Sequence, residues 1–289
     1  MHKKQVICLI LFIGCVFAPN AVPLVEIPDQ AGKYVLKYEL PVGTRFVITA
    51  RNFFERETVL PDGGLTGNTI EHKFEGNFEV EEAHAAQGLG LKMVFEKLNC
   101  EKNNPGGTFI DPFDTLTGYE VGFTLSPGGD LSGLEDFGNL PESDVLLRVS
   151  APDNFVHGAH NAFPHLPDRP VGPGDTWTYK MESVRPFSRG ARSLVTSEYT
   201  YRFAEVVEKD GIPCVKIEVS FIQSSKVEID TPRGATVAEH TGKGRETVFF
   251  AYKKGMFLSK QGVVEVKGSF GESPQTDHVE YTYQTEFIH

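Results

Sequence analysis

The stretch VEYTYQTEF, residues 279–287, alternates large apolar side chains with polar ones along nearly its whole length. Successive side chains of a β-strand point to opposite faces, so a period of two predicts a strand with one covered face and one wet face. Sheets that are wet on one face are typically antiparallel. The covered face would carry Val279, Tyr281, Tyr283 and Phe287, and the wet face Glu280, Thr282, Gln284 and Glu286.

The same alternation recurs along the chain, and turn sequences separate the alternating stretches. Clear examples lie at 34–40, 73–81, 119–125, 199–203 and 215–221. Pro-Asp-Gly-Gly at 61–64 and Pro-Gly-Gly-Asp at 127–130 are typical turn signals. The sequence therefore predicts a mainly β protein.

Two stretches suggest that the β-rich region is duplicated. PVGTRFV at 41–47 matches GPGDTWT at 172–178, and weaker matches follow in the same order in both halves. A repeat of about 125 residues should be recognised before the fold is assigned. We predict two homologous curved antiparallel sheets, half-barrel-like, with repeat 1 at 33–140 and repeat 2 at 171–289. Residues 141–170 would connect them through a short helix, for which Ser143 is a plausible cap.

Trp177 is the only tryptophan and follows a Gly-Asp turn, which makes it a candidate for ligand stacking. The repeat favours another interpretation, because Phe46 occupies the matching position in the first copy. We expect a core anchor whose indole N–H finds a nearby acceptor.

The N-terminus has the features of an export signal. The cationic segment MHKKQ precedes VICLILFIG, an apolar run too short to span a bilayer as a helix. LFIGC, residues 11–15, resembles the bacterial lipobox, with Phe12 where Leu is usual. This predicts a signal peptide at 1–14, lipidation of Cys15 and a tether at 15–32. The protein would then be anchored to a membrane of the cell envelope. The alternative is a secreted or periplasmic soluble protein, cut near Ala21.

Charge and cysteine count limit the function further. The chain of 289 residues has a net charge of −11, and removing Lys3 and Lys4 with the signal makes it −13. Such an acidic chain lacks the basic footprint of nucleic-acid binding. Cys100 and Cys214 would remain besides Cys15, and either a disulfide or two separate thiols is compatible with export.

These features together resemble a known group. The lipobox, the two strand-rich copies and the link from Phe163 to Trp177 resemble uncharacterised bacterial lipoproteins that contain a domain of unknown function. The resemblance covers nearly the whole mature chain and implies no activity. A looser similarity, at the level of fold, is to the lipoprotein-carrier half-barrels of the bacterial envelope, in which a curved antiparallel sheet wraps a helix and an apolar cavity.

The sequence contains weak candidates for a metal site and no recognisable catalytic motif. His157, His160 and His165 are weak metal candidates, because no Cys, Asp or Glu completes a ligand set at suitable spacing; a His-rich surface connector is the alternative. The sequence has no Gly-x-Ser-x-Gly elbow and no His-Glu-x-x-His motif. We expect no enzyme activity and no cofactor.

The inward-facing aromatic residues are the remaining candidates for a site. They could line a cavity for an apolar or lipid-like molecule, or they could form a filled core. Our leading prediction is a non-catalytic envelope lipoprotein that binds such a ligand, with a packed-core interaction or scaffold protein and an envelope hydrolase as alternatives. The candidate lining residues are Tyr34, Phe74, Phe78, Phe123, Tyr199, Tyr201, Tyr281 and Tyr283.

Overall fold

The computed structural model describes residues 32–60, 62–111, 116–134, 161–187, 191–231, 234–270 and 273–288. Within these ranges most residues belong to β-strands, and every strand pairing is antiparallel. The prediction of a mainly β fold is confirmed. The strands are β1 (Arg45–Val59), β2 (Leu65–His84), β3 (Gly88–Asn104), β4 (Gly107–Asp111), β5 (Glu120–Leu125), β6 (Leu131–Ser132), β7 (Thr176–Phe187), β8 (Ala191–Lys209), β9 (Ile212–Thr231), β10 (Gly234–Ala251), β11 (Met256–Phe270) and β12 (Ser273–Ile288).

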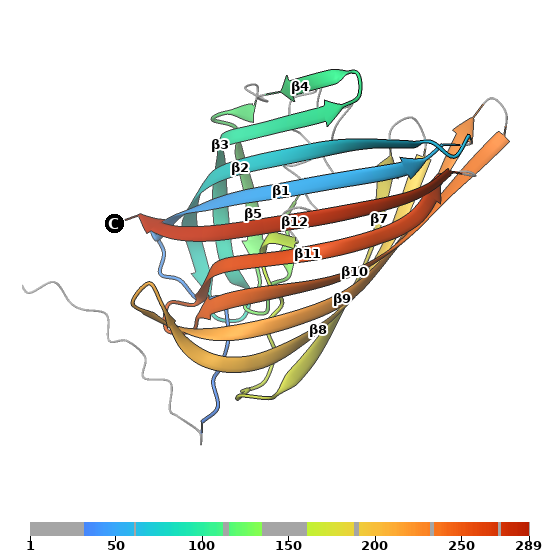
Figure 1. Ribbon diagram of the computed structural model, residues 1–289. Helices are drawn as coiled ribbons and strands as arrows, with labels where there is room; N and C mark the ends of the chain where they lie inside the picture. The colour runs from blue at the N-terminus through green and yellow to red at the C-terminus, as the bar shows by residue number, and fades with distance from the viewer. Residues whose placement is uncertain are drawn as a thin grey trace, which may run out of the picture.

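All described strands belong to one open sheet rather than to the two that the repeat predicted (Figure 1). Its order is β6-β5-β3-β2-β1-β12-β11-β10-β9-β8-β7, with β4 paired to β3. The two predicted halves join where the last strand pairs with the first, from Arg45 opposite Ile288 to Thr58 opposite Gln275. Backbone hydrogen bonding of β12 to both β1 and β11 therefore merges the halves into a single surface.

The sheet is strongly curved, so that β5 and β7, near its two ends, lie behind β1 and β12 in Figure 1. Glycines on the concave face help to explain the bend. A Cβ atom on Gly244 would lie 2.2 Å from the ring of Phe221, and one on Gly262 would lie 2.5 Å from the Tyr281 hydroxyl oxygen. Each glycine thus leaves room for an aromatic side chain of the neighbouring strand, an arrangement typical of sheets at points of high curvature.

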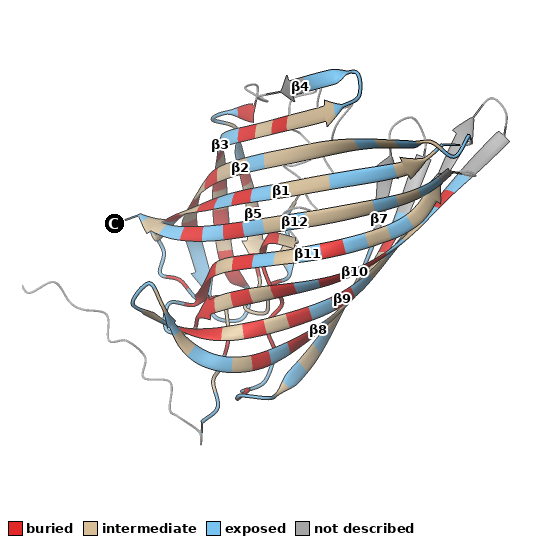
Figure 2. Ribbon diagram, in the orientation of Figure 1, coloured by how far each residue is buried: buried red, intermediate tan, exposed pale blue. Residues whose placement is uncertain are grey.

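The core lies on the concave side and towards one end of the strands, where Figure 2 shows the buried residues gathered. Two irregular segments, 35–43 and 163–171, contribute side chains to it. The buried Tyr38 hydroxyl donates to the Pro164 carbonyl oxygen at 2.9 Å, which ties the two segments together. The chain itself therefore supplies much of the packing at this end of the sheet.

The two matched turn sequences adopt the same geometry. The Gly43 amide donates to the Val80 carbonyl at 2.8 Å, and the Gly174 amide donates to the Phe203 carbonyl at the same distance. Both glycines have positive φ, 82° and 89°, a region that favours glycine. The matching turns agree with a duplication, which stays a prediction.

Trp177 lies on β7 and is partly buried against the core. Its indole N–H donates to the His165 carbonyl oxygen at 3.0 Å, and its ring stacks on Tyr201 with centroids 5.4 Å apart. These contacts fit the anchoring role expected from the repeat.

Cys100 and Cys214 are both buried and form no disulfide with one another, so the alternative of two separate cysteines holds. The signal peptide, Cys15 and most of the tether lie outside the described residues, as do most of the predicted connector helix, His157 and His160. No helix within the described ranges is long and apolar enough to cross a membrane.

Candidate functional site

The structure brings the eight predicted lining aromatics into one cluster on the concave face. For the seven that lie on strands, alternation together with the curvature gives this common direction, whereas Tyr34 lies outside the sheet at an isolated bridge to Val171. Four of them are buried in the core and the others pack partly buried against it. Their role as ligand-lining residues stays a prediction. The buried ones are Phe78, Phe123, Tyr201 and Tyr283, and the partly buried ones are Tyr34, Phe74, Tyr199 and Tyr281.

A row of inward-facing polar residues crosses the sheet beside this aromatic cluster. Strand register places His72 opposite Asn52, and Asn52 opposite Tyr281. Across Gly262, the same row continues to Glu246 on β10. We call His72, Asn52, Tyr281, Glu246 and Lys260 the polar belt; Lys260 lies one inward position from Gly262 on β11.

Glu246 and Lys260 form a buried ion pair at the centre of the belt. The side chains are 1% and 7% exposed, and the Lys260 Nζ lies 3.1 Å from the Glu246 Oε2. The same carboxylate oxygen accepts a hydrogen bond from the Tyr281 hydroxyl at 2.6 Å. Lys260 also donates to the Asn161 carbonyl oxygen at 2.6 Å, which ties the end of the connector to the sheet. Buried charges require such partners, because transfer from water costs several kcal/mol for each ion.

The second carboxylate oxygen of Glu246 is different. Oε1 is buried and has no hydrogen-bond partner among the described residues. An unsatisfied buried acceptor costs about 1–3 kcal/mol, and more when it is charged. The belt therefore holds one buried acceptor whose hydrogen-bonding capacity no described residue uses.

Glu246 also affects the tyrosines around it. Burial, followed by the negative charge of Glu246, raises the pKa of Tyr281 and of Tyr38 well above the usual range. Burial raises the pKa of Tyr283 to about 12, against an opposing hydrogen bond from Asn52 and with a smaller contribution from the charge of Glu246. All three phenols stay protonated at neutral pH, so they present uncharged hydroxyls to the concave side.

His72 ends the belt on β2. Burial lowers the pKa of its imidazole, so the ring is neutral at pH 7. Its Nε2 is buried with no hydrogen-bond partner among the described residues, and the ring lies 5.7 Å from that of Phe54. It adds a second unsatisfied polar atom to the same row.

Sequence reasoning missed Glu246 and Lys260. The signal was present in the alternation, because Glu246 shares strand parity with the inward-facing Val248 and Phe250. An acid at a covered position of a strand is unusual, and such a residue is normally paired. Its partner could not be predicted, because Lys260 comes from another strand, after a turn and a register shift.

The structure places His165 in the interior rather than on a surface connector. Its ring stacks on Tyr179 at 3.3 Å, and its Nδ1 lies 3.5 Å from an Asp130 carboxylate oxygen. Among the residues that the structure describes, no group of three or more His, Cys, Asp or Glu side chains could hold a metal ion.

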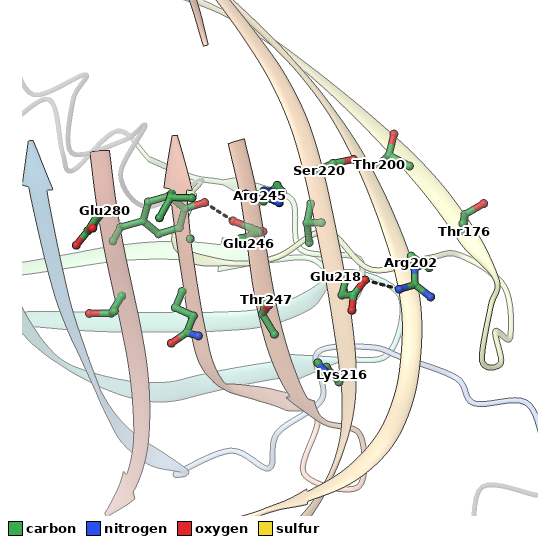
Figure 3. A pocket seen from close by; sticks show the side chains of 16 residues that line it. Thr176, Thr200, Arg202, Lys216, Glu218, Ser220, Arg245, Glu246, Thr247 and Glu280 are labelled. Atoms are coloured by element: carbon green, nitrogen blue, oxygen red, sulfur yellow. Dashed lines mark hydrogen bonds and ion pairs between the residues drawn. The ribbon is translucent and has the colours of Figure 1, made fainter. Parts of the chain in front are cut away.

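The outer face of the sheet carries a shallow groove of about 840 Å³ across β7 to β12 (Figure 3). Its side chains are mainly polar and come from outward positions, as Arg245 and Thr247 on either side of Glu246 illustrate. Arg202 and Glu218 form an ion pair there, drawn as a dashed line in Figure 3. The groove is open to solvent and lacks the apolar walls of a typical small-molecule pocket.

Comparisons with known proteins define no family for this chain. No family model matches, and no curated protein matches significantly. Among solved structures, the chain is similar to a candidate exported protein with a YmcC-like fold from Bacteroides fragilis, with 12% identity, a TM-score of 0.22, and 85% of this chain and 97% of that one covered. It is also similar to the COG4313 outer membrane channel from Pseudomonas putida F1, with 9% identity, a TM-score of 0.32, and 91% and 100% covered. A candidate lipoprotein from Parabacteroides distasonis gives 10% identity, a TM-score of 0.20, and 85% and 97% covered.

Proposed function

We propose that this protein is a non-catalytic, lipid-anchored protein of the bacterial cell envelope that holds an apolar, lipid-like ligand against the concave face of its sheet. The observation that carries the proposal is the pairing of an aromatic concave surface with the polar belt, in which the Glu246 Oε1 is buried and has no hydrogen-bond partner within the described part of the chain. Ligand sites in proteins are mostly apolar with a few placed polar groups, and this surface has that composition.

The aromatic part of the surface supplies most of the expected binding energy. Tyr199 and Tyr281 are partly buried, so ligand binding would remove further apolar area from water. Each Å² of apolar surface removed contributes roughly 25 cal/mol. The polar belt would then orient the ligand rather than hold it.

Lipid anchoring rests on the sequence around Cys15 and on how the folded part begins. Tyr34 pairs with Val171 as an isolated β-bridge, and the Lys33 Nζ forms an ion pair with Asp175 at 2.8 Å. The described part of the chain is thus tied to the rest of the fold within a few residues of its first described position. Acyl chains on Cys15 would anchor the protein because each buried methylene contributes about 0.8 kcal/mol.

Anchoring has a direct test. Cys15→Ser should move the protein from the membrane to the soluble fraction and abolish incorporation of labelled fatty acid. Unchanged partitioning of the variant would overturn the lipoprotein proposal.

Ligand binding is tested by mass spectrometry of lipids that co-purify with residues 16–289, a form that contains every described residue. We expect a bound lipid in the wild type and less of it in Tyr199→Ala, which truncates the concave surface. Thr200→Ala is the matched control, because the next residue of β8 faces the opposite side and is exposed. Repeated absence of lipid from the wild type would overturn the carrier proposal, and equal loss in both variants would argue against the concave face as the site.

A further inference from the structure

We infer that the ligand is an uncharged amphiphile with a hydroxyl headgroup, and that its headgroup binds at Glu246, Lys260 and Tyr281. This inference rests on the proposed function and specifies its ligand class. Three properties of the described residues carry it: the hydrogen-bonding capacity left over at the belt, its charge balance, and the apolar row beside it.

The free hydrogen-bonding capacity at the centre of the belt is that of an acceptor. Two donors of Lys260 are used by Glu246 and by the Asn161 carbonyl. The ammonium also faces the rings of Tyr281 and Tyr283, 5.7 and 5.8 Å from their centroids. The Tyr281 hydroxyl donates a hydrogen bond to the Glu246 Oε2, while the Oε1 receives none from any residue that the structure describes. A ligand group that fits must therefore donate, as a hydroxyl does.

Charge balance excludes a charged headgroup. The carboxylate of Glu246 and the ammonium of Lys260 neutralise one another at 3.1 Å in a site with almost no solvent exposure. An anionic headgroup at Oε1 would face the carboxylate, and a cationic headgroup would add a second positive charge beside Lys260. Each would leave one buried charge uncompensated, which is strongly unfavourable.

An apolar row lies next to the belt and gives the ligand's chain a path. On each strand from β2 to β8, the next inward-facing residue beyond the belt lies further from the end of the sheet that holds the core. Strand register aligns these residues into a second row. From β10, which carries Glu246, this row extends three strand spacings to Phe54 on β1, about 14 Å at 4.8 Å each, and two spacings to Tyr199 on β8. Gly244 on β10 is its only member without a side chain between those two residues. The row comprises Ile70, Phe54, Val279, Val264, Phe221 and Tyr199.

The experiment compares three probes with the same oleyl or oleoyl chain: 1-monooleoylglycerol, oleic acid and oleylamine. Their dissociation constants for residues 16–289 are measured by isothermal titration calorimetry below each probe's aggregation threshold. We expect the monoacylglycerol to bind at least about tenfold more tightly than the acid or the amine. A tenfold difference corresponds to about 1.4 kcal/mol, the size of one hydrogen bond to a charged acceptor.

A paired variant locates the preference. Glu246→Leu with Lys260→Met removes the acceptor and its counter-charge together, and should bind monooleoylglycerol about tenfold more weakly while binding all three probes alike. Glu218→Leu with Arg202→Met is the matched control, because it removes an ion pair from the outer face and should keep the preference.

The outcomes separate the two levels of the proposal. Equal binding of the three probes by the wild type, or a preference that persists in the belt variant, overturns the hydroxyl site and leaves water as the partner of Oε1. Failure to bind any of the probes overturns the proposed function itself. The wild-type comparison decides the inference even if the paired variant does not fold.

Discussion

Replacing Lys260 by methionine should destabilise the protein strongly, because it leaves the Glu246 carboxylate buried without its counter-charge. The Lys260 Nζ lies 3.1 Å from the Glu246 Oε2, and the two side chains are 7% and 1% exposed. At this separation and an effective dielectric constant of about 20, the attraction is about 5 kcal/mol. Measured losses on breaking buried pairs are about 3–5 kcal/mol, which is our expected cost for Lys260→Met.

The assay is urea unfolding followed by the fluorescence of the single tryptophan, Trp177, which packs in the same sheet. In thermal unfolding the same loss should lower the Tm by roughly 6–20 °C for a chain of this size. Lys216→Met is the matched control, because that lysine also pairs with a glutamate, at 3.0 Å, but the pair is 30% and 56% exposed. Its loss should cost no more than about 1 kcal/mol.

The double variant provides a second test of the ion pair. Glu246→Leu combined with Lys260→Met should be much less destabilising than Lys260→Met alone, since it removes both charges and leaves apolar side chains in an apolar surrounding. The belt would not hold a strongly coupled ion pair if Lys260→Met cost as little as Lys216→Met. The same conclusion would follow if the double variant were as unstable as the single one.

Three further predictions concern a glycine, the tryptophan and a cysteine of the sheet. Gly262→Ala should lower the free energy of unfolding in urea by about 1–3 kcal/mol, because its Cβ would lie 2.5 Å from the Tyr281 hydroxyl and 2.8 Å from the Arg245 carbonyl oxygen. Gly242→Ala should cost less, because the nearest neighbours of its Cβ would be valine side-chain atoms at 3.1 and 3.3 Å. The opposite order of the two costs would contradict the close-approach argument. Trp177→Phe should cost about 1–2 kcal/mol through loss of the hydrogen bond to the His165 carbonyl and part of the stack on Tyr201, measured as a lower Tm by circular dichroism; an unchanged Tm would show that the indole is not an anchor. Burial raises the pKa of the Cys214 thiol to about 11, so at pH 8 a thiol reagent should label it far more slowly in the native protein than in urea, and equal rates would show that the site is open.

Much of the fold could be predicted because its signal is local. A period of two in the side chains follows from strand geometry alone, so stretches such as 279–287 identify both the strands and their covered faces. The same alternation correctly assigned the seven aromatics that lie on strands to one side of the sheet. The Gly-containing turns could also be predicted from the sequence, since Gly43 and Gly174 adopt the positive φ that favours glycine.

The number of sheets and the candidate site depended on long-range pairing. Nothing within β1 or β12 indicates that the two strands pair, because their partners are more than two hundred residues apart in the chain; this pairing turned two expected sheets into one. The filling of the interior by Leu36, Tyr38 and Phe163 likewise comes from segments that form no strand, although the alternation at 34–40 predicted one.

The sequence by itself determined the strands, their covered faces, the turns and the acidic character of the chain, because each depends on neighbouring residues or on composition. Only the tertiary structure decided that Glu246, Lys260 and Tyr281 meet on the concave face. The reason is physical: strand parity gives a side chain its face, whereas its neighbour across the sheet is set by register between strands, and register arises from the packing of the whole sheet.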